Sequence, residues 1–490
     1  MSRINTNVSS LLAQRVLANQ NRGLVTSLER LSTGLRINRG ADNPAGLIAS
    51  ENLRSEKAAI GAALGNAQRA EQVVNVAEGG LQEVNNLLLE LQSLIGATAN
   101  DAGVSEEEKE ANQLQIDSIL QTIDRLANAT SFQGIKLLNG NFDYTTSNVA
   151  ATITDVSVNS ARLSDTANAY ISVTVDVLTS AQTGVVFVST NANLVNGGNG
   201  SITFEITGSN GVQQFTFASG TSQANISAAI NTFKDALGVS AIQNATDNNR
   251  IQINATEFGS GEFVRVNVLE GTSSNLLAAT AGGAVTSQDL KDVGRDATVL
   301  INGNQATTDG LTARVSYDGF DVSISLDGTG ALNITNGTSS FQVTGGGADF
   351  NLSPKVNLAG KVSLGIQTVT TGNLGNEVDG FLSGLKSGGA ANVINGDLST
   401  AQNIVDAAIK QVTSLRGRLG AFQKNVVGAT INSLGVSLEN TAAAESVIRD
   451  TDFAVETTEL TRAQIMQAAG TSVLAIANAT NQAVLSLLGE

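Results

Sequence analysis

The residues of this chain whose types could do chemistry are a few acidic and glycine-rich positions in its middle third. Glu257 and Glu262 are close in sequence, and paired carboxylates can share acid–base work. The stretches Gly259-Ser260-Gly261 and Gly345-Gly346-Gly347 suggest phosphate loops, but they lack the downstream glycine of a dinucleotide turn and any Gly-Lys-Ser/Thr ending. No apolar pocket or partner base accompanies the two glutamates. The pattern therefore predicts solvated strand ends and hairpin turns.

The residue types on which most sites depend are missing from the sequence. The 490 residues include no Cys and no His, which excludes disulfides, a cysteine nucleophile, a Ser-His-Asp triad and a His-ligated metal. We therefore predict a protein that is not an enzyme and has no catalytic, cofactor-binding or metal site. The net charge of -16 argues against nucleic acid as a partner, because phosphate binding needs clustered Lys and Arg.

The sequence also predicts no membrane span. No stretch reaches the ~18 consecutive apolar residues that a spanning helix requires. The N-terminus lacks the apolar core of a cleaved secretory signal. If the protein leaves the cell, we expect an export route that does not read such a signal.

Six arginines near the N-terminus form a further charged group: Arg3, Arg15, Arg22, Arg30, Arg36 and Arg39. One interpretation is a solvated helix face. The alternative is pairing between subunits with acids near the other terminus, namely Glu445, Asp450, Asp452, Glu456 and Glu459. The sequence leaves both interpretations open.

Two long segments carry the apolar spacing of a coiled coil, with alternating steps of three and four residues. The first runs from Ile60 to Ile95 and the second from Val405 to Val436, with a shorter stripe from Ile116 to Ala127. We predict that the two long segments pair within one chain. The alternative is that all three are core helices of one globular domain. The residues predicted for the intramolecular coiled coil are Val74, Leu81, Val84, Leu88, Leu91, Ile95, Val405, Val412, Leu415, Leu419, Phe422 and Val426.

The two ends of the chain are helix-patterned arms, and the C-terminal arm is apolar on more than one face. Such a helix must be buried on more than one face, which a single intramolecular partner rarely achieves. We therefore predict that neighbouring subunits cover these arms, which would be poorly ordered in a free monomer. The residues predicted for this polymerisation interface are Ile4, Val8, Leu11, Leu28, Leu31, Leu35, Phe453, Leu460, Ile465, Val473, Leu474, Ile476, Val484, Leu487 and Leu488.

Between residues 141 and 372 the apolar period changes to two, as in Ile171, Val173, Val175 and Val177. Glycine-containing turns such as Asp318-Gly319 separate the runs. The fold class predicted is therefore multidomain, with an all-α coiled-coil core formed by paired N- and C-terminal helices and inserted β-rich (α+β) central domains. We place a division near residue 290, which gives one central domain at 141–290, containing one helix, and another at 291–372.

Two motifs at opposite ends of the chain resemble those of bacterial flagellins. The first is Leu31-Ser32-Thr33-Gly34-Leu35-Arg36-Ile37-Asn38, continuing through Ala41-Asp42-Asn43-Pro44-Ala45-Gly46-Leu47. The second is Ala463-Gln464-Ile465-Met466-Gln467-Ala468-Ala469-Gly470, followed by Ala477-Asn478 and Val484-Leu485-Ser486-Leu487-Leu488. The resemblance covers roughly residues 1–140 and 375–490, in the expected order.

This resemblance implies a flagellar filament subunit that supports swimming motility. It assigns the helical arms 1–42 and 451–490 to the inner filament core, the coiled-coil segments 43–140 and 373–450 to the outer core, and the central domains to the outside. It also implies export of the unfolded chain by the flagellar type III apparatus and a secreted, extracellular location. The implied partners are further copies of the chain, an export chaperone at the C-terminal arm, and the filament cap and hook-associated proteins.

One segment departs from the family pattern. Flagellins sensed by the innate immune Toll-like receptor carry an arginine-rich patch in the first long coiled-coil helix. Here the corresponding stretch is Leu87-Leu88-Leu89-Glu90-Leu91-Gln92-Ser93-Leu94. We therefore expect weak recognition by that receptor.

Other functions stay open at this point. A hook–filament junction protein shares the terminal pattern and is the alternative within the same class. From a different class, the middle region could be an adhesin or a carbohydrate-binding module that the arms only carry. An enzyme ranks third, because His and Cys are missing.

Overall fold

The computed structural model describes residues 6–100, 103–164, 169–189, 201–218, 220–243, 250–270, 277–279, 288–328 and 338–488; the side chains of 480–488 are not among them. The chain forms two compact units. We call residues 1–72, 351–360 and 421–490 the helical unit, and residues 73–350 and 361–420 the mixed unit.

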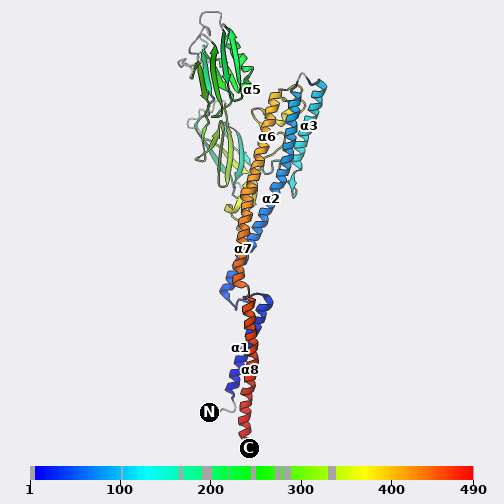
Figure 1. The fold of residues 1–490 in the computed structure, drawn as a ribbon, viewed down its shortest axis with the longest axis vertical. Coiled ribbons are helices and arrows are strands. Elements are labelled where there is room, and N and C mark those ends of the chain that lie inside the picture. Colours follow the sequence, from blue (N-terminus) through cyan, green and yellow to red (C-terminus); the bar gives the residue numbers. More distant parts are fainter. Residues whose placement is uncertain are drawn as a thin grey trace. The chain divides into compact units, whose positions relative to one another are not determined.

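The helical unit contains antiparallel helix pairs. Its elements are α1 (Val8–Thr33), the first part of α2 (Pro44–Thr98), the 3₁₀ turn η1 (Leu358–Gly360), the π-helix η3 (Phe422–Gly428), α7 (Ala429–Arg449) and α8 (Phe453–Leu488). Figure 1 shows α1 lying alongside α8. The two terminal arms therefore pack on each other within a single chain, whereas the sequence predicted that neighbouring subunits cover them.

Local capping sets the ends of α1. The side chain of Asn7 accepts a hydrogen bond from the backbone N–H of Ser10, which satisfies a donor that the first helical turn leaves free. At the other end Gly34 adopts a left-handed conformation, with φ of 73°, and its N–H bonds to the carbonyl of Arg30. Glycine adopts this conformation without the steric penalty of a side chain, so α1 ends there.

Within the helical unit α2 and α7 also run antiparallel. The Lys57 ammonium lies 2.5 Å from the Glu445 carboxylate, and the Arg449 guanidinium lies 2.9 Å from Glu51. Residue numbers therefore rise along α2 where they fall along α7, as expected for antiparallel helices. Between these ion pairs and the π-helix, a small apolar cluster joins Ile60, Ala63 and Leu434.

The π-helix changes the register of the predicted C-terminal seam. The heptad predicts Val426 and Val436 inside, but Val426 is half-buried and Val436 is 59% exposed. Val427 and Leu434 are buried instead. A π-helix holds an extra residue per turn, which moves the residues after it by one position relative to the repeat. The seam therefore continues through Val427, and the expectation for Val426 is corrected.

Three helices form the helical layer of the mixed unit. They are the second part of α2, α3 (Glu106–Ala129) and α6 (Leu398–Ala421), and Figure 1 shows them side by side. Antiparallel α2 and α6 are joined by a hydrogen bond from Gln92 to Asp406, at 2.6 Å, and an ion pair between Arg416 and Glu78, at 2.8 Å. The predicted α2 and α6 seam residues of this unit are all buried; they are Val74, Leu81, Val84, Leu88, Leu91, Ile95, Val405, Val412, Leu415 and Leu419.

Polar side chains of α3 hold the irregular segment between residues 371 and 393. The side chain of Gln113 donates to the carbonyl of Leu385 and accepts from the N–H of Val393, at 2.8 and 2.9 Å. Asp124 accepts from both the N–H and the hydroxyl of Thr371. Side chains of one helix thereby satisfy backbone groups of Thr371, Leu385 and Val393 in a segment that has only short regular elements.

The central strands form two β domains, one nested in the other. The host β domain contains β3 (Thr145–Ser147), β4 (Ile153–Ala161), β5 (Ile171–Thr179), β14 (Thr298–Ile301), β15 (Asn304–Gln305), β16 (Thr307–Asp309), β17 (Thr312–Tyr317), β18 (Phe320–Leu326) and β19 (Thr338–Gly345). Its sheets have the orders β15-β14-β5-β19-β3 and β16-β17-β18-β4. The inward residues of both sheets form one apolar cluster that includes Val175, Val322 and Phe341.

The inserted β domain follows the same plan. It contains β6 (Val185–Ser189), β7 (Ser201–Thr207), β8 (Val212–Ala218), α4 (Gln223–Asn231), α5 (Lys234–Leu237), β9 (Val239–Gln243), β10 (Arg250–Ala255), β11 (Phe263–Glu270), β12 (Leu277–Ala278) and β13 (Asp289–Val293). The sheets are ordered β12-β6-β10-β9 and β13-β11-β7-β8 around a separate core that includes Phe204. Short strands complete the chain: β1 (Ser131–Phe132), β2 (Ile135–Lys136), β20 (Ala348–Asn351), β21 (Lys361–Leu364), β22 (Gly375–Asn376) and β23 (Gly380–Phe381), with the 3₁₀ turn η2 (Leu382–Leu385).

This nesting differs from the expected division of the middle region near residue 290. Strand β5 pairs with β14 and β19, so residues on both sides of 290 share one sheet. Strand β13, which crosses residue 290, pairs with β11 of the inserted domain. The alternating pattern identified the strands correctly, but sheet partners far apart in sequence leave no local signal.

The inserted domain leaves and re-enters the host at one point. Gln182 and Arg295 form an isolated bridge, in which each backbone N–H donates to the other residue's carbonyl at 2.8 Å. Beside it, the Asp296 carboxylate accepts from the N–H and hydroxyl of Ser260 and from the N–H of Gly310. Asp296 therefore ties a turn of the inserted domain to a turn of the host.

We expect Asp296→Asn to weaken the contact between the inserted domain and the host in a pH-dependent way. The Ser260 hydroxyl, then the Gly310 and Ser260 N–H groups, lower the pKa of Asp296. A lowered folded-state pKa adds stability above the usual value of 3.8, and this stability is lost as the pH falls through the folded-state pKa. The free energy of unfolding of the variant should be about 1–2 kcal/mol lower than that of the wild type at pH 7. Denaturant unfolding should show this difference shrinking below pH 3.8; an unchanged difference in acid would contradict the assignment.

Candidate assembly interface

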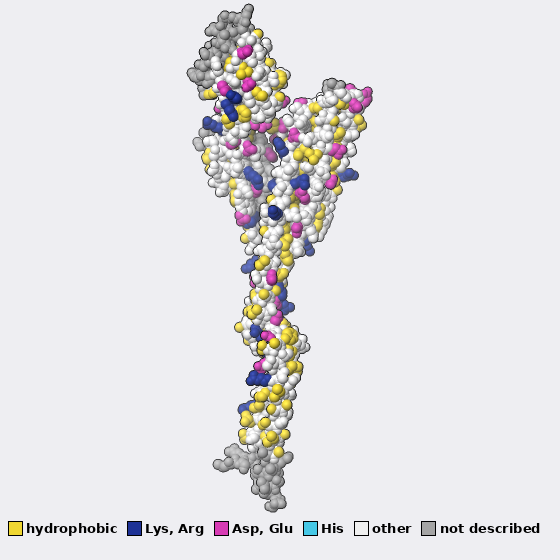
Figure 2. Space-filling model, in the orientation of Figure 1, with side chains coloured by type: hydrophobic (Ala, Val, Ile, Leu, Met, Phe, Trp, Pro, Cys, Tyr) yellow, Lys and Arg dark blue, Asp and Glu magenta, His cyan; other side chains and the backbone are white. Residues whose placement is uncertain are grey.

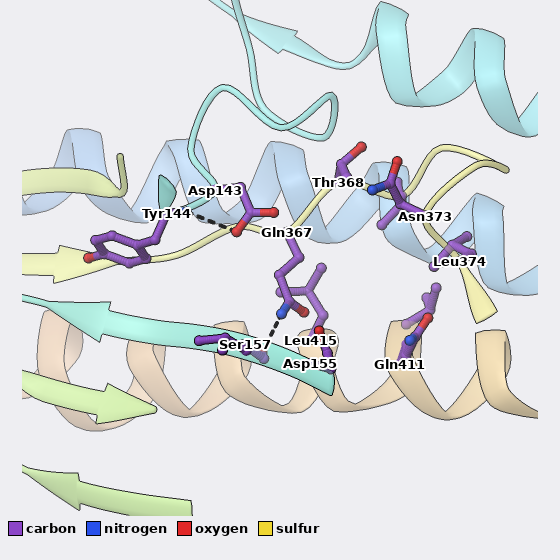
Figure 3. Close-up of a pocket in the computed structure, with 13 residues that line it drawn as sticks. Asp143, Tyr144, Asp155, Ser157, Gln367, Thr368, Asn373, Leu374, Gln411 and Leu415 are labelled. Atoms are coloured by element: carbon purple, nitrogen blue, oxygen red, sulfur yellow. Dashed lines mark hydrogen bonds between the residues drawn. The ribbon is translucent and has the colours of Figure 1, made fainter. Parts of the chain in front are cut away.

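A polar cavity of about 170 Å³ in the mixed unit is a candidate small-molecule site, and Figure 3 shows its lining. Asp143 and Asp155 provide its carboxylates. The Gln367 amide donates to the hydroxyl of Ser157, and the Gln411 side chain accepts from the N–H of Gly375. These polar groups thus hold the neighbouring chain segments in place.

Burial shifts the pKa values of two groups that line this cavity. Burial raises the pKa of Asp143, although the N–H of Tyr144 bonds to its carboxylate at 2.9 Å. Burial also raises the pKa of Tyr144 to about 12. The Tyr144 hydroxyl donates to the carbonyl of Ala161 and accepts from its N–H, at 3.1 and 2.9 Å. Both groups therefore have structural partners.

The acidic and glycine-rich positions considered from the sequence lie at strand ends and in the connections between strands. The N–H of Glu262 bonds to the carbonyl of Gly259, which closes the turn that Asp296 holds. A side chain at Gly346, whose φ is 91°, would lie 2.0 Å from the carbonyl oxygen of Asp143. Glycine is required there by close backbone approach. In the described part of the chain, His, Cys, Asp and Glu form no group of three able to hold a metal.

The terminal helices pack through small side chains. Ser10, Ala13 and Ser27 are the buried residues of α1. On α8, a side chain at Gly470 would come within 3.2 Å of Leu17, so the helices approach closely there. Small residues at such contacts let two helix backbones come near each other.

Polar contacts fix the register of this pair. Asn7 donates to the carbonyl of Ala477 at 2.9 Å, and the hydroxyl of Ser10 donates to Asn478 at 2.8 Å. Farther along, Gln467 donates to Asn21 at 2.7 Å. The described parts of α1 and α8 are therefore aligned from end to end.

The narrow seam leaves much apolar surface uncovered, and Figure 2 shows apolar side chains along the visible face of this pair. Twelve large apolar side chains of the described α1 and α8 residues are 43–66% exposed. They are Val8, Leu11, Leu12, Val16, Val25, Leu28, Phe453, Val455, Ile465, Met466, Val473 and Ile476. Large exposed apolar areas on a soluble protein commonly mark an interaction site.

Most residues predicted for the polymerisation interface lie on this pair. Seven are among the exposed twelve: Val8, Leu11, Leu28, Phe453, Ile465, Val473 and Ile476. The half-buried residues are Leu31, Leu35, Leu460 and Leu474. Ile4 and the side chains of Val484, Leu487 and Leu488 lie outside the described residues. Sequence reasoning missed Leu12, Val16, Val25, Val455 and Met466, because it followed single stripes instead of whole apolar faces.

The N-terminal arginines have several different environments. Arg30 lies 3.6 Å from Glu456, and Arg39 lies 3.0 Å from Glu29. Arg36 donates to the carbonyls of Val447 and Ile448. These side chains are engaged within one chain, whereas Arg3 lies outside the described residues.

Comparison with known proteins gives the same family at both ends of the chain. The model described as the bacterial flagellin N-terminal helical region matches residues 4–143, and the model described as the C-terminal helical region matches residues 402–488. Among the described residues, no helix combines the length and the apolar character needed to span a bilayer.

Full-length relatives agree with these matches. Flagellin B of Vibrio cholerae serotype O1 is 29% identical over 497 residues, and B-type flagellin of Pseudomonas aeruginosa is 30% identical over 546 residues. Each alignment covers 99% of this chain and 99% of the relative. A structure of the flagellar cap protein FliD from Escherichia coli has a TM-score of 0.28 and 16% identity, covering 41% of this chain and 99% of that chain. The relatives and both helical regions show that the chain belongs to the bacterial flagellin family.

Proposed function

We propose that this filament structural subunit polymerises through the exposed apolar faces of α1 and α8. The observation that carries the proposal is the set of twelve half-exposed apolar side chains on two helices that already pack on each other. Complete burial of one such side chain contributes about 1.5–3 kcal/mol, so burying the remaining exposed area of several contributes several kcal/mol. A contact between unlike surfaces that does not close a ring produces a helical filament.

The same surface accounts for control of assembly. The α1–α8 pair leaves much of its apolar surface uncovered, so we propose that the pair loses order in a free monomer. Ordering a backbone residue costs about 1–2 kcal/mol, which resists assembly until neighbours cover the arms. We propose that α1 and α8 form the inner filament core and that α2, α3, α6 and α7 form the outer core. The β domains then face outward. This role requires no catalytic step.

We expect the double variant Ile465→Asp/Ile476→Asp to abolish polymerisation. Both side chains are about two-thirds exposed, so the carboxylates are solvated in the monomer and its fold is retained. Burying them between subunits removes their hydration without a partner charge, which is strongly unfavourable. Seeded assembly followed by sedimentation and electron microscopy measures the loss. Val212→Asp, at a 58% exposed strand residue, is the matched control; assembly of the double variant at the control's rate would refute the proposal.

Further partners follow from family membership. We propose export of the unfolded chain through the flagellar type III apparatus to an extracellular filament, with an export chaperone bound to the C-terminal arm. The filament cap and hook-associated proteins are the other proposed partners. The full-length matches to curated flagellins favour a filament subunit over a hook–filament junction protein.

We expect weak activation of the flagellin-sensing Toll-like receptor. The segment that replaces the arginine-rich patch presents Leu89 and Glu90 to solvent, while Gln92 is bound to Asp406. An exposed acid at this position does not supply the positive charge of an arginine patch. A cell reporter assay with purified monomer, beside an arginine-bearing flagellin at equal concentration, tests this; equal potency would show the expectation to be wrong.

A further inference from the structure

The corner between α7 and α8 contains a groove of about 430 Å³ with an acidic lining. Asp450, Asp452 and Glu456 contribute three negative charges and Arg36 one positive charge, for a net charge of -2 (1 − 3). Glu456 is paired with Arg30 of the same chain. Among the described residues, no cation forms an ion pair with Asp450 or Asp452.

A second feature of the groove is a buried hydroxyl without a hydrogen-bond partner. Thr451 is only 8% exposed, and its hydroxyl has no hydrogen-bond partner among the described residues. Buried polar groups in native proteins are nearly always bonded. Val447 and Val455, also in the groove lining, are 77% and 59% exposed. Asp450 accepts a hydrogen bond from the Ser446 hydroxyl, and Asp452 accepts from the N–H groups of Ala454 and Val455. The groove thus combines two acids without a cationic partner among the described residues, an unbonded hydroxyl and apolar walls.

A complementary surface lies on α1. Arg15 and Arg22 are seven residues apart, so they project from the same side of the helix about 10 Å from each other. At 3.6 residues per turn this side is opposite the one on which Ser10 and Ala13 pack against α8. Both arginines are exposed, and neither forms an ion pair with a described residue. Exposed Leu11 lies beside them.

The arginines cannot reach the groove of their own chain. Thr451 of the groove bonds to Gly34, just past the end of α1. Arg22 lies twelve residues earlier, which is about 18 Å along the helix. Arg15 lies farther still. The arginines of a second copy of the chain are not subject to this distance and can reach the groove.

We propose that the acidic groove at the α7–α8 corner binds the Arg15–Arg22 face of α1 from a neighbouring copy of this chain. The inference rests on the proposed polymerisation and assigns a specific contact to it. Because the two surfaces differ, each copy can donate one and accept at the other, as an open helical assembly requires. The charges also favour one register over others that the apolar faces allow.

Charge reversal tests the pairing. Arg22→Glu and Asp450→Lys should each raise the critical concentration for seeded assembly about tenfold or more, because like charges then meet. The double variant Arg22→Glu/Asp450→Lys should return to within about threefold of wild type. Lys234→Glu, at an exposed residue of α5, is the control for the charge change of Arg22→Glu. Circular dichroism of each monomer shows that the helices are kept. Single variants that assemble like the control, or a double variant without rescue, would overturn the pairing.

Because the chain has no cysteine, introduced thiols give a second test. Filaments are assembled from an equal mixture of Asp450→Cys with either Arg15→Cys or Arg22→Cys, and are then treated with a bismaleimide crosslinker. The linker is used because a disulfide needs Cα atoms about 4.4–6.8 Å apart, closer than an extended arginine and a carboxylate hold them, and crosslinked heterodimers in at least one mixture would support the contact. Filaments without any such heterodimer would overturn it and leave the proposed function standing. Wild-type chain that forms no filaments under any seeding condition would instead overturn the proposed function.

Discussion

Deleting residues 451–490 is expected to abolish polymerisation and to leave the mixed unit folded. The deletion removes α8, which supplies half of the twelve exposed apolar residues and is the helix on which α1 packs. No residue of the mixed unit lies in this segment, so its thermal unfolding should be unchanged. Electron microscopy after seeding, together with calorimetry of the monomer, measures both effects.

The control for this truncation is the wild-type chain under identical seeding. Filaments formed by the truncated chain would show that α8 is dispensable for polymerisation and would contradict the proposed assembly through α1 and α8. A truncated chain whose mixed unit also unfolds would contradict the division into two units. The Ile465→Asp/Ile476→Asp variant separates loss of the apolar surface from loss of the whole helix.

The second large effect is expected at the π-helix, where neighbouring valines differ in environment. Val427 is fully buried and Val426 is half-buried. Val427→Asp places a carboxylate in the seam and should destabilise the helical unit by roughly 3 kcal/mol or more. Val426→Asp should change the free energy of unfolding by about 1 kcal/mol or less. Chemical denaturation followed by circular dichroism compares the two.

This pair of variants tests the register directly, because each valine is the control for the other. A seam in the uninterrupted heptad register would reverse the order of the two effects. Equal effects would indicate that the segment samples both registers. The substitutions are chemically identical and adjacent, so a difference between them reports position and not residue type.

The coiled-coil core could be predicted from the sequence because its signal is local and long. Apolar residues from Ile60 to Ile95 recur every three or four positions, and the structure buries that stripe. The π-helix could not be predicted in this way. Val426 and Val427 are adjacent and chemically equal, so the sequence allows either to occupy the seam.

The central region was predictable as strands but not as sheets. Alternation in β5 marks Val173 and Val175 as inward-facing, and both are buried. Its partners β14 and β19 lie more than a hundred residues away, and antiparallel pairing over such a distance depends on the complete fold. The contacts of Asp296 with Ser260 and Gly310 could not be predicted for the same reason, because these residues lie in turns that are far apart in sequence.

The bridge between Gln182 and Arg295 has a consequence for how this protein can vary. Because the inserted domain departs and returns through adjacent backbone positions, it constrains the host at this bridge and at the neighbouring Asp296 contacts with Ser260 and Gly310. Any domain whose own ends lie equally close can occupy this position without changing the host's pairing. The bridge is therefore a position at which evolution or an engineer can replace one β domain by another while the helices proposed to polymerise stay the same.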